Sequence, residues 1–260
     1  MAEASLAGVT LHYEIAGPSD APLVAFVGAL GYGPWLWGWQ APDLTGPWQT
    51  LVWDLPGTGA SDAPPADCDV TFLADALEAV LADAAVPRAH VVGAGLGGLV
   101  ALLYANRYGR ARSLTCFGAA PAGDAFDEDA LRALALDAVD GGECERSLEG
   151  ALTPTFRAER PDLVERICDW RRAEDARGTA FDRHLEAVRT FDGPQLHAVT
   201  APALVFHGED DPVVPAAAGR ELAAGLPRGR FQAVAGRHLC FVEHAGPVTD
   251  RLAGFLETVS

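Results

Sequence analysis

The chain has 260 residues, 49% of them hydrophobic, which is enough to bury the core of one α/β domain that carries an insertion. Its formal net charge is −17, every basic residue is arginine, and no lysine occurs. This charge argues against nucleic acid and anionic membranes as partners. No apolar run reaches transmembrane length, and the first residues lack the regions of a signal peptide, so we expect a soluble, unprocessed protein. The oligomeric state stays open.

The five cysteines are odd in number, widely spaced and without a C-x-x-C pair (Cys68, Cys116, Cys144, Cys168, Cys240). We therefore expect neither a disulfide framework nor a metal site, and a reducing cytoplasm as the location. Acidic residues alternate with arginines rather than forming a tail, which predicts a hydrated surface. Together with the Ala- and Gly-rich, lysine-free composition, this surface suggests a salt-loving organism, although a GC-rich genome would explain the missing lysine equally well.

The N-terminal part alternates apolar and polar residues over 5–16, which predicts a β-hairpin turning at Ala7-Gly8. The apolar run 22–27 predicts a strand buried on both faces, as in a parallel sheet. A glycine-rich loop, 28–33, follows it, and its backbone amides could converge on a ligand. Three tryptophans come next (Trp35, Trp37, Trp39), and they either line a pocket or pack against the sheet.

A second buried strand is predicted over 50–54, and helical periodicity over 71–84, with Thr71 as the N-cap. The stretch 89–108 then joins an apolar strand (90–94) to a glycine cluster and to an apolar helix that starts near Leu96.

Two interpretations fit this glycine cluster. Gly93, Gly95 and Gly98 match the dinucleotide fingerprint G-x-G-x-x-G, but the next strand, 113–118, ends without the acidic residue that would hold a ribose. Residues 93–97 also match the nucleophile elbow G-x-Nu-x-G, which we favour. In that alignment the central residue is Gly95, so the turn has the form of a nucleophile's scaffold without the nucleophile.

The alternation of strands and helices stops after 118. Residues 122–198 are acidic and Arg-rich with helical patterns over 128–139, 161–172 and 180–191, which predict an inserted helical cap. A strand (203–207), a helix (216–226), a strand (230–234) and a final helix (244–259) complete the chain. We expect residues 1–121 and 199–260 to form the core domain.

Several motifs together resemble the α/β-hydrolase superfamily. Residues 54–61 (DLPGTGAS) are similar to its D-x-x-G-x-G-x-S turn, 208–215 to its acid loop and 236–238 to its histidine loop, in the order nucleophile, acid, base. The resemblance covers nearly the whole chain outside the cap. It implies an α/β-hydrolase fold with a mainly parallel, doubly wound sheet, and a cap similar to those of small-molecule lactonases and esterases.

The resemblance also implies site residues. His238 would be the base, Asp211 would orient it, with Asp210 as the competing candidate, and the N–H groups of Ala29 and Leu96 would form an oxyanion hole. The family usually has histidine at the position of Val27, and this departure weakens the oxyanion assignment.

The missing side chain at Gly95 closes the acyl-enzyme route unless another residue replaces it, and Cys240 and Cys116 are the two candidates. We expect a cofactor-free, metal-free hydrolase or related acid/base enzyme acting on a small carbonyl compound. The alternative is a catalytically silent protein that binds a small molecule in the same pocket.

Overall fold

The computed structural model describes residues 2–136 and 141–259, and within them eight strands form one sheet in the order β1-β2-β4-β3-β5-β6-β7-β8. β1 (Ala2–Leu6) and β2 (Val9–Ala16) form the predicted antiparallel hairpin, with Ala7 and Gly8 at φ 51° and 83°. β2 is antiparallel to β4, and the other neighbouring pairs are parallel. The mainly parallel sheet is thus confirmed.

The parallel strands agree with the sequence prediction to within about two residues at each end. They are β3 (Leu23–Val27), β4 (Gln49–Trp53), β5 (Ala89–Ala94), β6 (Ala111–Phe117), β7 (Ala203–Gly208) and β8 (Gly229–Val234). Every residue of β3, β5 and β7 is buried. Such strands lack alternation because helices cover both faces of the sheet.

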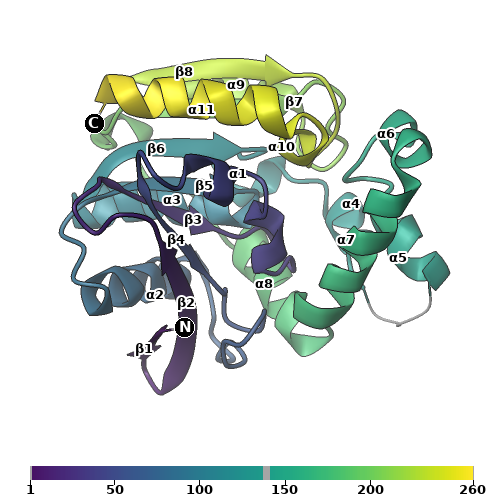
Figure 1. Cartoon of the computed structure of the whole chain (residues 1–260), viewed down its shortest axis with the longest axis horizontal. Helices are drawn as coiled ribbons and strands as arrows, with labels where there is room; N and C mark the ends of the chain where they lie inside the picture. Colours follow the sequence, from purple (N-terminus) through teal and green to yellow (C-terminus); the bar gives the residue numbers. More distant parts are fainter. Residues whose placement is uncertain (1, 137–140, 260) are drawn as a thin grey trace.

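The helices of the sheet domain pack on the sheet as shown in Figure 1. They are η1 (Pro34–Trp37), α1 (Gln40–Leu44), α2 (Val70–Asp83), α3 (Leu96–Tyr108), α9 (Ala216–Gly225), α10 (Cys240–Glu243) and α11 (Ala245–Val259). α3 contacts α2, β5 and β6, while α11 contacts α1 and β6. The N-cap of α2 was predicted wrongly: Asp69, not Thr71, caps it by accepting from the Phe72 N–H at 2.7 Å, because Asp69 is the extended residue at that end.

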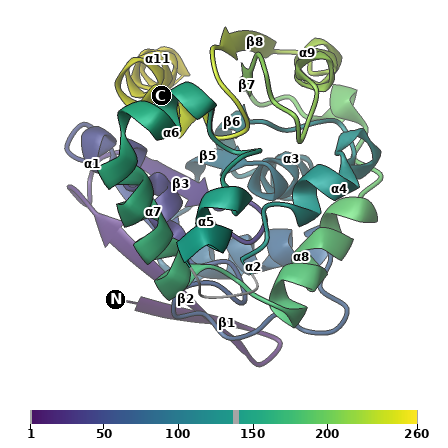
Figure 2. The same cartoon turned by 90° about the vertical axis from the view of Figure 1, so that its right-hand side faces the viewer.

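The segment between β6 and β7 is helical, and no strand occurs in its described residues, 122–136 and 141–198. It contains η2 (Gly123–Ala125), α4 (Glu128–Arg132), α5 (Gly141–Ser147), α6 (Pro154–Glu159), α7 (Pro161–Glu174), α8 (Thr179–Arg189) and η3 (Leu196–Ala198). Figures 1 and 2 show α4–α8 gathered at the end of the sheet toward which β6 and β8 point. The helix expected over 128–139 ends at Arg132, and 137–140 lie outside the described residues. α6 was not predicted, although Thr153 and Pro154 are typical of a helix start.

Two of the five cysteines are paired, which corrects the expectation from the sequence. Cys144 of α5 and Cys168 of α7 form a disulfide with their Cα atoms 5.8 Å apart. Their separation of 24 positions matches no spacing rule, because the pairing depends on how the two helices pack. Within the described residues, no helix combines the length and the apolar character needed to cross a bilayer.

Candidate active site

The turn between β5 and α3 is built around Gly95, whose backbone lies at φ 49° and ψ −115°. The Gly95 N–H donates to the Phe117 carbonyl at 2.9 Å, and the Gly95 carbonyl accepts from the Gly98 N–H at 2.9 Å. A Cβ atom on Gly97 would lie 2.3 Å from the Val27 carbonyl oxygen, so this position tolerates no side chain. The turn therefore has the strained, close-packed geometry expected of a nucleophile elbow.

His238 and Asp211 meet beside this turn. His238 Nδ1 lies 2.8 Å from Asp211 Oδ2, and the other carboxylate oxygen accepts from the Val213 and Val214 N–H groups at 2.8 and 3.1 Å. Because the carboxylate accepts, Nδ1 carries the proton in this network and Nε2 is left as an acceptor. Burial alone would raise the pKa of Asp211, but the charge and hydrogen bond of His238, helped by His207 and the Val214 N–H, hold it below its ordinary value.

The position of the missing nucleophile lies directly in front of this histidine. A Cβ atom built on Gly95 would lie 3.2 Å from His238 Nε2 and 3.7 Å from the Ala29 Cβ. No described residue forms a hydrogen bond with Nε2 through its side chain or backbone. The structure thus brings His238, Asp211 and Gly95 together.

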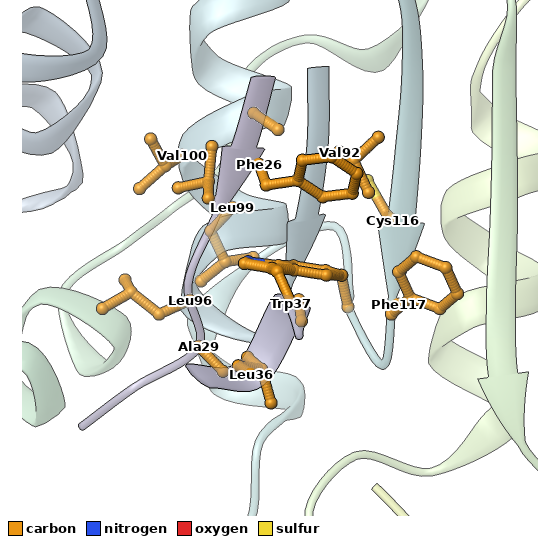
Figure 3. Close-up of a cluster of buried hydrophobic side chains, with 14 of the residues drawn as sticks. Phe26, Ala29, Leu36, Trp37, Val92, Leu96, Leu99, Val100, Cys116 and Phe117 are labelled. Carbon is orange, nitrogen blue, oxygen red and sulfur yellow. The ribbon is translucent and has the colours of Figure 1, made fainter. Parts of the chain in front are cut away.

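The two N–H groups expected at an oxyanion hole flank the same position. Ala29 follows β3, and Leu96 is the first residue of α3, where helix N–H groups have no partner within the helix. Within residues 2–136 and 141–259, neither N–H donates to a protein acceptor. Both residues belong to the buried cluster of Figure 3, in which Trp37 packs against Phe117 with ring centroids 6.0 Å apart. This arrangement leaves two free donors near residue 95.

The competing candidates occupy other positions. Asp210 is exposed, and only its backbone N–H is engaged, with the Gly236 carbonyl at 3.0 Å. Cys116 and Cys240 are fully buried. Burial raises the pKa of the Cys116 thiol to about 12, and burial followed by the charge of Asp211 raises that of Cys240. Neither thiol is therefore ionised as a nucleophile must be.

Sequence reasoning missed two residues that touch the site. His207 lies with Nε2 3.5 Å from Asp211 Oδ2 and 2.8 Å from the Val214 carbonyl oxygen. A Cβ atom on Gly118, at φ 52°, would lie 3.0 Å from His238 Nδ1 and 3.2 Å from Asp211 Oδ2. The His207-x-x-x-Asp211 spacing and the glycine that ends β6 were the available signals.

The loop that carries Ala29 is held by side chains from α7. Asp175 Oδ1 accepts from the Gly33 N–H at 2.9 Å and from Trp35 Nε1 at 2.8 Å, and Asp175 Oδ2 accepts from Arg171 Nε at 2.6 Å. Arg171 also donates to the Leu134 carbonyl at 2.7 Å and to the Ser147 hydroxyl. All three guanidinium nitrogens are thus bound within the protein.

His184 of α8 holds the same loop from another side. Its Nδ1 accepts from the Gly31 N–H at 3.3 Å, and its Nε2 lies 2.9 Å from the Pro56 carbonyl oxygen. Burial, opposed only by the bond to Pro56, lowers the pKa of His184 to about 4, so the ring is neutral. Arg171, Asp175 and His184 are called the loop clamp below.

No group of three His, Cys, Asp or Glu side chains within the described residues is arranged to hold a metal ion. The groups that meet at the site are an imidazole, a carboxylate bonded to it and two backbone N–H groups.

Comparison with known proteins identifies the family of the chain. Residues 24–251 match the model of the alpha/beta hydrolase family. The chain is 32% identical over 259 residues to the putative carbamate hydrolase RutD of Variovorax paradoxus, covering 96% of this chain and 97% of that protein. It is 26% identical over 242 residues to 3-oxoadipate enol-lactonase 2 of Acinetobacter baylyi, covering 90% and 88%.

Solved structures show the same fold. The enol-lactonase of Burkholderia xenovorans LB400 superposes with a TM-score of 0.87 at 24% identity, covering 98% of this chain and all of that one. A hydrolase from Pseudomonas aeruginosa PA01 superposes with a TM-score of 0.85 at 28% identity, covering 97% and 96%. The match over most of its length shows that this chain belongs to the alpha/beta hydrolase family.

Proposed function

We propose that the protein is a cofactor-free hydrolase that uses His238 to activate a water molecule beside Gly95. The observation that carries this proposal is the 3.2 Å separation between His238 Nε2 and the position of the missing Cβ atom. Nε2 has no hydrogen-bond partner among the described residues, so it is free to accept a hydrogen bond from a water molecule. A retained Asp211–His238 pair supports chemistry, since a pocket that only binds has no need of a base and its orienting carboxylate.

The proposed reaction has no covalent intermediate. His238 Nε2 takes one proton from the water as its oxygen bonds to the substrate carbonyl carbon, and the resulting oxyanion accepts from the N–H groups of Ala29 and Leu96. Asp211 stabilises the imidazolium that forms. The carbon–leaving-group bond then breaks, and His238 returns the proton to the leaving group, which restores the neutral base.

The relatives support a substrate that is a small carbonyl compound. The names of two relatives state action on an enol-lactone and, as a putative activity, on a carbamate. We propose a substrate of this size that binds between a core of residues 1–121 and 199–260 and a helical cap of residues 122–198. Small molecules, rather than nucleic acid or membranes, are the proposed partners.

The test is to search for an intermediate during turnover. A panel of lactones, methyl esters and carbamates is hydrolysed, the reaction is quenched with acid, and the intact mass of the protein is measured. We expect turnover with an unmodified mass, little activity on p-nitrophenyl esters, and no adduct with serine-directed phosphonates. An adduct on any residue, Cys240 included, would overturn direct attack by water.

Restoring the nucleophile is a second test. Gly95→Ser should gain short-chain esterase activity on the order of 10²-fold and form a phosphonate adduct at residue 95, because its hydroxyl would lie next to His238. The positive φ costs serine roughly 1–3 kcal/mol of strain, and His238 must shift by a few tenths of an ångström.

Two controls accompany that variant. Gly95→Ala carries the same strain without the hydroxyl, and Gly95→Ser with His238→Gln lacks the base. A folded Gly95→Ser protein that is no more active than Gly95→Ala would contradict an otherwise complete site.

A protein that binds a ligand without chemistry is the alternative, and the missing nucleophile favours it. His238→Gln separates the two functions. Under the proposed function it abolishes turnover of the best substrate, whereas under the alternative no member of the panel is turned over and ligand affinity stays unchanged.

We also propose a salt-rich cytoplasm as the setting, supported by the excess of acidic residues. The Cys144–Cys168 disulfide weighs against a reducing compartment. Trapping free thiols in intact cells decides the point: two additional free thiols relative to the purified protein support the cytoplasm, and an intact disulfide contradicts it.

A further inference from the structure

A cavity of about 500 Å³ lies between the tryptophan-rich segment after β3 and helix α7, and no step of the proposed reaction uses it. Its volume is in the range of small-molecule sites. Aromatic and charged side chains dominate its lining: Trp35, Trp39, Trp170, Arg160, Arg166 and Glu174.

The three tryptophans form three sides of a box. The rings of Trp35 and Trp170 are nearly parallel, with an interplanar angle of 19° and centroids 6.4 Å apart. Trp39 stands edge-on to both, at 80° and 81°, with centroids 6.5 and 6.0 Å away. Trp35 is fixed because its Nε1 donates to Asp175 and its backbone N–H donates to Glu174. The Trp35 wall is therefore set before any ligand binds, which lowers the entropy cost of binding.

Two arginines, Arg160 and Arg166, line this box in a chain whose net charge is −17. Arg166 lies with its guanidinium carbon 5.1 Å from the Trp170 ring centroid, and neither it nor Arg160 forms an ion pair with a described residue. Glu174 opposes them, but its carboxylate accepts from the Trp35 N–H, and burial raises its pKa. A guanidinium stacked on an indole keeps its N–H edges free for an anion.

We propose that this box is a binding site for a small aromatic carboxylate, separate from the Gly95–His238 site. The aryl ring packs against the indoles of Trp39 and Trp170, and the carboxylate accepts charge-assisted hydrogen bonds from Arg160 and Arg166. A cation of the same shape meets two guanidinium charges. The site therefore favours ligands that carry both an aromatic ring and a negative charge.

The test compares three probes of similar size: phenylacetate, 2-phenylacetamide and phenyltrimethylammonium. Affinities are measured by calorimetry, and the indole N–H signals are followed in ¹⁵N-correlated NMR spectra. We expect phenylacetate to bind about tenfold more tightly than the neutral amide, the loss typical of removing a hydrogen bond to a charged group, and the cation to bind most weakly. The indole signals of Trp39 and Trp170 should shift on binding.

Variants assign the effect to the box. Arg160→Gln with Arg166→Gln should remove the preference for phenylacetate over the amide, Trp39→Leu should weaken both, and the exposed control Arg88→Gln should change neither. The proposal is overturned if no probe binds saturably, if the cation binds as tightly as the anion, or if the double variant retains the preference. It is also overturned if only other indole signals shift.

Discussion

Asp211 with His238 and Asp175 with Arg171 are two buried acid–base pairs, and both adjoin the loop that follows β3. Their side chains are similarly inaccessible: 0% and 4% exposed in the first pair, 1% and 2% in the second. The two pairs differ in how many nitrogens of the basic side chain have hydrogen-bond partners. Every nitrogen of Arg171 has an acceptor in the protein, whereas His238 Nε2 has no described hydrogen-bond partner and faces the vacant position at Gly95.

Burial and pairing alone therefore do not mark a reactive group. A saturated pair such as Arg171–Asp175 stabilises the fold, because its charges are satisfied by fixed partners. A pair in which one nitrogen keeps a free acceptor site is available for proton transfer. We therefore expect substitutions in the Arg171–Asp175 pair to change stability and substitutions in the Asp211–His238 pair to change activity.

The largest expected effect is on activity at His238. His238→Gln should lower turnover of the best lactone, ester or carbamate substrate by about 10²–10⁴-fold, the usual contribution of a general base, while changing the free energy of unfolding far less. The matched control is His244→Gln, an exposed histidine on the following turn. Unchanged turnover in His238→Gln would show that the Asp211–His238 pair does not serve activity and so does not differ in function from Arg171–Asp175.

Arg171 should show the opposite behaviour. Arg171→Leu leaves the Asp175 carboxylate buried without its cation and should lower the free energy of unfolding by about 3–5 kcal/mol, measured by urea denaturation. Arg172→Leu, which breaks a partly exposed pair with Asp169, should cost less than about 1 kcal/mol. Equal losses in the two variants would show that Arg171 does not stabilise the clamp.

Reducing the disulfide should lower the stability of the loop clamp without lowering turnover. The Cys144–Cys168 bond joins α5 to α7, and Ser147 and Arg171 lie one turn further along these helices. Cys168→Ala or a mild reductant should lower stability by about 3 kcal/mol, as expected for a loop of this length. Cys68→Ala serves as a control for an unpaired buried cysteine. A loss of turnover without a loss of stability would place the disulfide's effect at the site instead.

The smallest expected effect is the pH dependence of the clamp. The pKa of His184 is about 4 in the folded protein against 6.5 ordinarily, so the unfolded chain binds the proton first as the pH falls. Stability from this residue is complete above about pH 6.5 and is lost toward pH 4, by roughly 2–3 kcal/mol. Urea denaturation between pH 4 and 6.5 measures the free energy of unfolding. It should change less with pH in His184→Gln than in the parent protein, whereas His244→Gln should follow the parent.

The sequence predicted the order and type of the sheet elements well, because buried strands and amphipathic helices are local patterns. The motif over 54–61 also follows from local chemistry: Ser61 donates to the Asp54 carbonyl at 2.7 Å, and Asp54 Oδ2 accepts from the Ala60 N–H at 2.8 Å. These bonds close a turn within eight residues, so the motif itself specifies the structure.

The features that escaped prediction depend on packing between distant segments. Cys144 and Cys168 pair because α5 and α7 meet, and Gly118 matters because His238 and Asp211, from two later loops, lie against it. The roles of His238, Asp211, Ala29 and Leu96 remain predictions, although the structure brings these residues together at residue 95. Arg171 and Asp175 form an i, i+4 pair that resembles an ordinary surface contact in the sequence.

The helical segment between β6 and β7 separates the site residues in the order of synthesis. Gly95 and Ala29 are synthesised before that segment, and Asp211 and His238 after it, so no early portion of the chain contains a whole site. Long-range contacts of this kind form late, because the entropy of closing the intervening loop must be overcome first. A nascent chain that ends before β7 contains Ala29 and Gly95 but neither Asp211 nor His238.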